Sequence, residues 1–263
     1  MFRRTLAAGC ILLLIGGMAH AQLRVLETKD LRLVYFGEAI AYLVPHVART
    51  FAGALHFEQG LFGYRPDDKN TIVLLDLKDL GNASAGPSPR NHILFYIAPS
   101  SYTFETILGN ERIQSTLNHE LVHIMTSDQP APRDRLFRKW LGGKGGLNAE
   151  NPLTIPFGFL TTPRLWSPRW YMEGIAVFLE TWMAGGMGRA LGAYDEMVFR
   201  TLVRDGGPLY DMVSLDSAAP HRDFQGGSIH YLYGCRFFSW LALTHGPEKL
   251  IEWVARKEGT RTY

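Results

Sequence analysis

The chain has 263 residues, of which 46% are hydrophobic and 20% are charged, and its formal net charge is +2. This length suits one large domain or two small ones, and the composition is ordinary for a globular protein. A charge so close to balance gives no electrostatic case for a nucleic-acid partner or an anionic membrane surface.

The first 21 residues are typical of a secretory signal peptide. Arg3 and Arg4 precede an apolar run centred on residues 11–15, and Ala-His-Ala at 19–21 forms a small-x-small cleavage site. We therefore expect cleavage before residue 22 and a secreted or periplasmic location. The apolar run is too short for a comfortable span, so we expect no stable membrane span once the signal is removed. Cys235 is then the single cysteine, expected to be a core residue rather than a nucleophile.

The first half of the mature domain, residues 22–263, carries strand patterns. Alternating apolar residues predict a strand within 22–36, and a helix follows over 37–61, kinked at Pro45. Short β-branched or apolar runs predict strands at 71–77 and 91–98. The Gly-, Ser- and Pro-rich stretch 81–89 between them is predicted to be a loop.

The second half carries helix patterns. Apolar residues at helical spacing predict a helix over 110–127 with Asn110 as N-cap, and another from Ser167-Pro168 to about 183. A further helix is predicted over 228–245, ended by glycine and proline. Strands first and helices after predict an α+β fold, with a small N-terminal mixed sheet and a mostly helical C-terminal part.

The segment 129–167 is predicted to be a long loop because it contains two Gly-Gly pairs and five prolines. Loops of this length are often functional or disordered. Five basic residues cluster in it, and we interpret them as solvated: Arg133, Arg135, Arg138, Lys139 and Lys144.

The predicted helix 110–127 contains the sequence HELVH, an HExxH motif. His119 and His123 are four residues apart and share one helix face, so both imidazoles can reach one ion. Glu120 lies about 100° further round, beside the position where a water would be activated. This pattern predicts a zinc ion held by the histidines, with Glu120 as general base.

A catalytic zinc site needs a third protein ligand. Glu173 is the best candidate, because it lies in an otherwise apolar helix where a lone carboxylate requires a partner. A buried salt bridge would also satisfy Glu173. His221, His230 and Asp128 are competing candidates for the third ligand.

HELVH followed some fifty residues later by WYMEGIAVF resembles the gluzincin metallopeptidases. It is most similar to the bacterial secreted peptidase MA-like proteins, whose second motif reads tryptophan, a few residues, then Glu-Gly-x-Ala. The resemblance implies a thermolysin-like zincin fold in which His119, His123 and Glu173 bind Zn²⁺ and Glu120 is the base. It departs at Val177, where many gluzincins place an acidic residue that orients a zinc-bound histidine.

The resemblance also implies residues that contact the substrate. The strand just before the metal helix would be the edge strand that binds an extended peptide, through His92, Ile93, Leu94 and Phe95. Gluzincins place a tyrosine or histidine oxyanion donor on a later helix, and Tyr231 with Gly234 is similar to their Tyr-x-x-Gly pattern. His230 and Tyr233 are rivals for this role.

The sequence thus predicts a secreted zinc metallopeptidase acting on peptide or protein substrates. The alternatives are a non-catalytic binding domain that keeps zinc for structure and a zinc hydrolase of non-peptide amides. An intact HExxH argues against the first, because a structural site does not need Glu120. Related proteins often continue, sometimes into a β-propeller, so we expect a further C-terminal domain beyond Tyr263.

Overall fold

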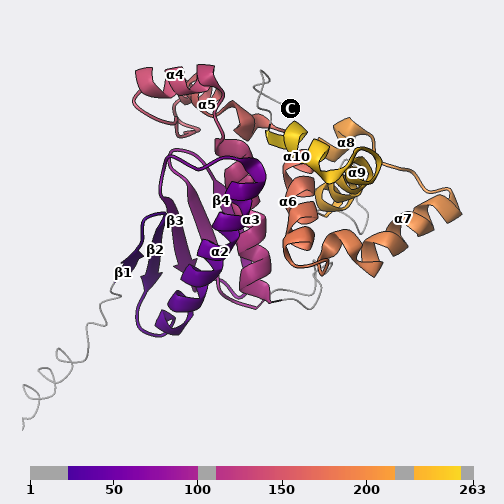
Figure 1. The fold of residues 1–263 in the computed structure, drawn as a ribbon, viewed down its shortest axis with the longest axis horizontal. Helices are drawn as coiled ribbons and strands as arrows, with labels where there is room; N and C mark the ends of the chain where they lie inside the picture. The colour runs from indigo at the N-terminus through magenta and orange to yellow at the C-terminus, as the bar shows by residue number, and fades with distance from the viewer. Residues whose placement is uncertain (1–22, 100–110, 217–227, 256–263) are drawn as a thin grey trace, which may run out of the picture.

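The computed structural model describes residues 23–99, 111–216 and 228–255. The predicted signal peptide, Asn110 and His221 lie outside these residues. Within them the chain forms an N-terminal sheet followed by a mostly helical part, which confirms the predicted α+β class (Figure 1). No helix of the described part is long and apolar enough to cross a membrane.

The sheet has five strands in the order β1-β2-β3-β5-β4. Their bounds are β1 Leu23–Glu27, β2 Leu31–Phe36, β3 Asn70–Leu75, β4 Asn82–Gly86 and β5 His92–Tyr96. The two outer pairs, β1–β2 and β4–β5, are antiparallel, whereas β2–β3 and β3–β5 are parallel. The predicted mixed sheet is therefore confirmed, with the single strand expected within 22–36 replaced by a hairpin.

The position of β5 corrects one prediction. The strand with His92, Ile93, Leu94 and Phe95 was expected at the edge of the sheet, but it pairs with β3 on one side and β4 on the other. Its backbone is therefore already bonded, and Ile93 and Phe95 are buried in the core. The edge strand next to β5 is β4, formed by part of the stretch predicted to be a loop, whose small and polar residues carry no strand signal of their own.

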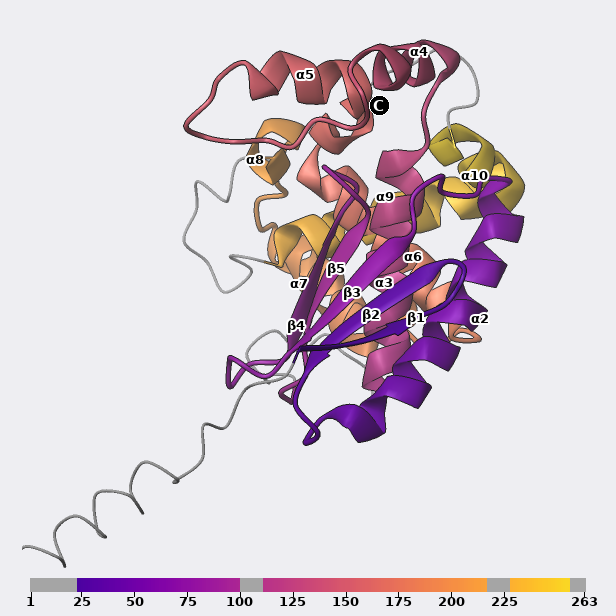
Figure 2. The ribbon, with the colours of Figure 1, turned by 90° about the vertical axis from the view of Figure 1, so that its left-hand side faces the viewer.

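Helices α2 (Val44–Phe62) and α3 (Arg112–Asp128) cover one face of the sheet (Figure 2). Alternate strand residues such as Leu33, Ile72 and Ile93 point into this layer. Helix α2 begins at Val44 rather than 37, preceded by the short 3-10 turn η1 (Ala41–Leu43), because Pro45 suits the first helical turn better than an interior position.

Helix α3 lies between the sheet and the C-terminal helices, so nearly all of its second half is buried. Glu111 caps it by accepting hydrogen bonds from the backbone N–H groups of Ile113 and Gln114. Arg112 donates to backbone carbonyls at the end of β5, including that of Ile97 at 2.5 Å. These contacts fix the start of α3 relative to the sheet.

The C-terminal layer is built around α6 (Arg169–Met183) and α9 (Ile229–His245). Helix α6 packs on both α3 and α9, and α10 (Pro247–Ala255) packs on α9. Between them the chain forms η4 (Arg189–Leu191), α7 (Ala193–Asp205) and α8 (Met212–Asp216). The helices predicted from Ser167-Pro168 and over 228–245 are thus present, with α6 beginning two residues after Ser167.

The prediction of a loop over 129–167 is wrong. The segment contains α4 (Pro132–Trp140), α5 (Thr154–Thr161) and η3 (Pro163–Trp166), at one end of the molecule (Figures 1 and 2). Buried Asp128, at the end of α3, binds Lys144 at 3.0 Å and Arg138 at 3.1 Å. Asp128 also accepts from Tyr64 and Asn91, so this polar network fastens the segment to the sheet layer.

Candidate metal centre

His119, His123 and Glu173 converge on one point, although they come from two helices. Their ligand atoms all lie within 4.8 Å of one another. Glu173 Oε2 is 3.2 Å from Nε2 of His119 and 3.3 Å from Nε2 of His123. The three side chains form the group expected from the sequence, at the face where α3 packs on α6.

This donor set fits a zinc ion. Zinc bonds of about 2.0–2.1 Å in a tetrahedron place neighbouring ligand atoms about 3.3 Å apart. The two separations from Glu173 Oε2, 3.2 and 3.3 Å, match this edge, and all three ligand atoms lie within 4.8 Å of one another. Two imidazoles and one carboxylate leave one of four positions open, as catalytic zinc sites do.

Asp128 and His230, the two competing third ligands within the described residues, do not join this group. Asp128 is engaged by Lys144 and Arg138 at the end of α3. His230 is buried, hydrogen-bonded to the backbone of Leu215, and is not a member of the converging group.

The charges of the centre are strongly coupled. Burial alone would raise the pKa of Glu173, but hydrogen bonds from His119 and His123 hold it far below its ordinary value. Burial disfavours a charged His119, yet its hydrogen bonds to Glu173 and Glu180 raise its pKa to about 9. A proton therefore occupies this site readily, and a metal ion would have to displace it.

Glu120 lies beside these groups without binding them. Its side chain is almost fully buried, and its Oε2 accepts no hydrogen bond from the described residues. Burial raises its pKa, opposed by the charges of His123 and His119. A buried carboxylate with a free oxygen beside a cationic group is placed to accept a proton from a water molecule.

Glu180 supplies the partner that the sequence comparison with gluzincins placed at position 177. Val177 is fully buried in the core, whereas Glu180 Oε2 lies 2.8 Å from Nδ1 of His119. Glu180 is seven residues after Glu173, which is two helical turns, so both carboxylates share one face of α6. Its isolation in an apolar helix was the signal that the sequence reasoning missed.

Arg189, from η4, completes this arrangement. Its Nε and Nη2 donate to the two oxygens of Glu180 at 2.6 and 2.7 Å, a bidentate pair. Burial opposes ionisation of Glu180, but the charge and hydrogen bonds of Arg189 lower its pKa to about 2. Glu180 therefore stays ionised and can hold the ring of His119 in one orientation. The local sequence gives no indication of this role for Arg189, because its contact with Glu180 is formed only when the chain folds.

Of the three candidate donors on α9, Tyr231 is the one whose ring lies against His119. The ring centroid of Tyr231 is 6.1 Å from that of His119. The guanidinium carbon of Arg189 lies 5.1 Å from the same Tyr231 centroid. Burial raises the pKa of Tyr231 to about 12, so its hydroxyl keeps its proton. Tyr233 instead packs on Phe199, with ring centroids 5.0 Å apart.

Two glycines bring Glu173 and Tyr231 together. Helices α6 and α9 touch at Gly174 and Gly234, and a Cβ built on Gly174 would lie 2.4 Å from the backbone of Gly234. A Cβ on Gly234 would lie 2.1 Å from the carbonyl oxygen of Trp170. A side chain fits at neither position, so Gly174 and Gly234 are required for the close packing of α6 on α9.

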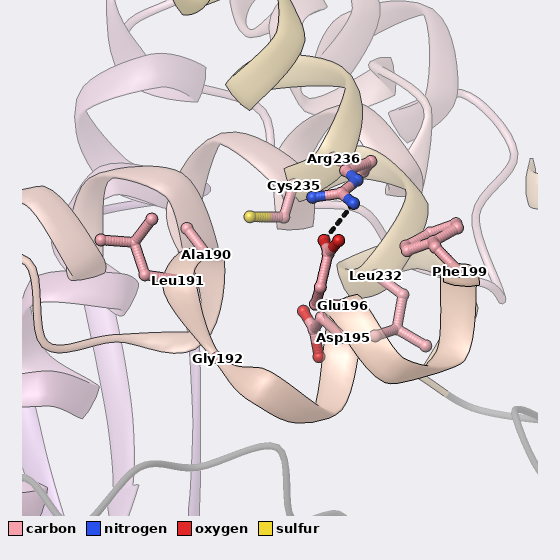
Figure 3. A pocket seen from close by; sticks show the side chains of 9 residues that line it. All are labelled: Ala190, Leu191, Gly192, Asp195, Glu196, Phe199, Leu232, Cys235 and Arg236. Atoms are coloured by element: carbon pink, nitrogen blue, oxygen red, sulfur yellow. Dashed lines mark hydrogen bonds and ion pairs between the residues drawn. The ribbon is translucent and has the colours of Figure 1, made fainter. Parts of the chain in front are cut away.

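A pocket of about 180 Å³ lies on the other side of η4, between α7 and α9 (Figure 3). None of the three converging residues lines it. An ion pair between Arg236 and Glu196 crosses it, and Asp195 lies beside that pair. Cys235 also lines it as a buried free thiol whose pKa burial raises to about 12, in agreement with a packing role.

Comparison with models of known protein families found no matching family, and comparison with curated proteins found no relative.

Proposed function

We propose that this protein is a secreted zinc metallopeptidase of the gluzincin type, with a thermolysin-like arrangement of sheet and helices. The observation that carries the proposal is that the ligand atoms of His119, His123 and Glu173 lie within 4.8 Å of one another, with Glu120 next to His119 on α3. A structural zinc site would have no use for a buried carboxylate such as Glu120, whose Oε2 has no hydrogen-bond partner among the described residues.

The residues divide the work as follows. His119, His123 and Glu173 would hold the zinc ion, which would supply Lewis-acid polarisation of the scissile carbonyl and lower the pKa of water. Glu120 accepts a proton from the attacking water and passes it to the leaving amine. Tyr231, which keeps its proton, donates a hydrogen bond to the oxyanion that develops on the carbonyl. Glu180 and Arg189 hold His119 in position.

The substrate strand is assigned to β4 rather than to β5. Strand β4 is the outer strand of the sheet and packs against α3, which carries His119 and His123. Among the described residues no strand pairs with its outer backbone edge, so an extended peptide can pair there. In this proposal the peptide would lie beside the metal helix, as the sequence resemblance implies, but on the neighbouring strand β4 rather than on β5.

A digest of a broad peptide library tests the proposal. Protein stripped with 1,10-phenanthroline should leave the library intact, and one equivalent of zinc should restore cleavage. Cleavage that persists in the metal-free protein would contradict a metallopeptidase. A zinc-loaded protein that cleaves no peptide but hydrolyses simple amides would favour the non-peptide hydrolase instead.

A further inference from the structure

The segment from α4 to α5, residues 132–161, forms a hairpin whose inner side is polar and fixed. Asp134 and Arg138 lie on the inner face of α4, and Arg138 binds buried Asp128. On α5, Gly158 and Thr161 are the buried residues. The hairpin is therefore anchored to the end of α3, and its other face is directed outward at one end of the molecule (Figure 2).

The outward face is apolar. Leu136 and Trp140 are four residues apart on α4, about half a turn away from Asp134 and Arg138. Trp140 is 75% exposed, and on α5 Ile155 is 52% exposed. The connection between the helices adds more exposed apolar side chains, namely Leu141, Leu147 and Leu153. An exposed apolar set of this size marks an interaction surface.

Three exposed cations flank the apolar face of α4. Arg133 lies on one side of Leu136 and Trp140, whereas Arg135 and Lys139 lie on the other. Within the described residues none of the three forms an ion pair, although Arg133 stacks on Phe137. Their charge is therefore available to an outside partner, which the overall net charge of +2 conceals.

A second exposed apolar set, around Met187, Leu191 and Val203, differs in its charges. There Arg200 is paired with Glu196, and Arg204 is paired with Asp205. Exposed apolar side chains alone thus do not distinguish α4–α5. What distinguishes the α4–α5 hairpin is an outward apolar stripe with cations on both sides that form no ion pair within the described residues.

We propose that the α4–α5 hairpin is a peripheral membrane-binding surface for bilayers rich in anionic phospholipid. An amphipathic helix of this pattern lies in the interface with its apolar face at the acyl boundary and its cations against the headgroup phosphates. Trp140 occupies the position that tryptophan favours at membrane–water interfaces. The anionic headgroups complement Arg133, Arg135 and Lys139.

This orientation would hold the metal centre close to the bilayer. His123 lies five residues before Asp128, which anchors the hairpin, and five residues of α-helix rise only about 7.5 Å. The membrane surface does not depend on the proposed peptidase activity, because no residue of the metal centre takes part in it.

Co-sedimentation with vesicles tests the proposal, using the full chain without its signal and vesicles of phosphatidylcholine with or without about 30% phosphatidylglycerol. We expect binding to the anionic vesicles that weakens with added salt, and little binding to pure phosphatidylcholine. Removing each cation should weaken binding about fivefold, so Arg135→Gln with Lys139→Gln should cost about 25-fold. Trp140→Ser should weaken binding about tenfold or more and abolish a blue shift of the tryptophan emission.

Matched variants elsewhere serve as controls. Leu243→Ser removes a side chain that is 88% exposed on α9, and Lys249→Gln removes an exposed cation on α10, so both should bind vesicles as the wild type does. Failure of the wild type to bind anionic vesicles would overturn the proposal. The proposal would also be overturned if Leu243→Ser lost as much vesicle binding as Trp140→Ser, or if the wild type bound uncharged and anionic vesicles equally well. A wild type that self-associates and becomes monomeric on Trp140→Ser would likewise overturn it, because the apolar face would then be a protein–protein interface.

Discussion

At the scale of single residues, the metal centre depends on a carboxylate that does not belong to the motif. Glu180 contacts Nδ1 of His119 and is itself held by both oxygens to Arg189. Such a partner fixes the tautomer and the orientation of a metal-binding imidazole. The absence of an acid at position 177 therefore does not leave His119 without support.

Glu180→Gln is expected to weaken zinc binding by about 10- to 100-fold, because the amide holds the imidazole less firmly and leaves Arg189 without its charge partner. Competition with a fluorescent zinc chelator measures this. Glu196→Gln, which alters an exposed carboxylate paired with Arg200, is the matched control and should bind zinc normally. Unchanged affinity in Glu180→Gln would show that Glu180 has no part in the centre.

Tyr231→Phe is expected to lower turnover by about 10²–10³ while zinc content stays at one per chain, because only the hydrogen bond to the oxyanion is lost. Tyr233→Phe is the control, since Tyr233 packs on Phe199 and lies away from His119. Steady-state kinetics with zinc analysis separate the two effects. Full activity of Tyr231→Phe together with an inactive His230→Ala would identify His230 as the donor.

At the scale of elements, α3, α6 and α9 are the framework of the site. The first two carry the converging ligands, and the third is brought to them through the glycine contact between Gly174 and Gly234. Close approach of two helices over small residues leaves no room for adjustment, so the spacing of Glu173 and Tyr231 is set by the backbone.

Gly174→Ala should separate these helices. The added methyl group would overlap the backbone of Gly234, which we expect to destabilise the fold by about 1–3 kcal/mol and to weaken zinc binding. Gly53→Ala in α2 is the matched control, since nothing lies within 4 Å of its added carbon and alanine favours helix by about 0.5–1 kcal/mol. Urea denaturation measures the free energy of unfolding of both variants. Equal values for Gly174→Ala and Gly53→Ala would contradict the importance of the glycine contact.

The elements that carry the motifs were predictable because their signals are local. Apolar residues at helical spacing placed α3 and α9, and HExxH placed the two histidines. Strand β4 and helices α4 and α5 were missed because their stability comes from partners distant in sequence. The strand forms by pairing with β5, and α4 is held by Asp128 through Arg138. Glu180 and Arg189 were missed for the same reason.

At the scale of the whole molecule, the layer of α2 and α3 is the core on which the site rests. One residue in this layer opposes stability: Glu58 on α2 is fully buried, and neither carboxylate oxygen has a hydrogen-bond partner among the described residues. Burial raises its pKa well above the ordinary value. Glu58 is therefore neutral in the folded state at pH values where it is ionised in the unfolded chain.

The sign of the resulting pH dependence follows from proton linkage. Above the ordinary carboxyl pKa of 4.5 the folded state binds more protons than the unfolded state, so stability falls as pH rises towards the folded pKa. Each pH unit in this window costs about 1.4 kcal/mol. Glu58→Gln removes the titration, so its advantage over the wild type should grow as the pH rises above 4.5.

Thermal unfolding at several pH values measures that difference. Glu150→Gln, at an exposed position in the α4–α5 connection, is the control and should follow the wild type throughout. A difference between Glu58→Gln and the wild type that stays constant with pH would show that Glu58 has an ordinary pKa in the folded protein.

In the proposed mechanism His119, His123 and Glu173 hold the metal, whereas Glu120 moves the proton. Turnover of zinc-saturated Glu120→Gln on a peptide cleaved by the wild type tests this mechanism most directly. We predict one zinc per chain, bound as tightly as in the wild type, with turnover reduced by about 10²–10⁴. Turnover close to that of the wild type at full zinc occupancy would contradict the role of Glu120 as the general base.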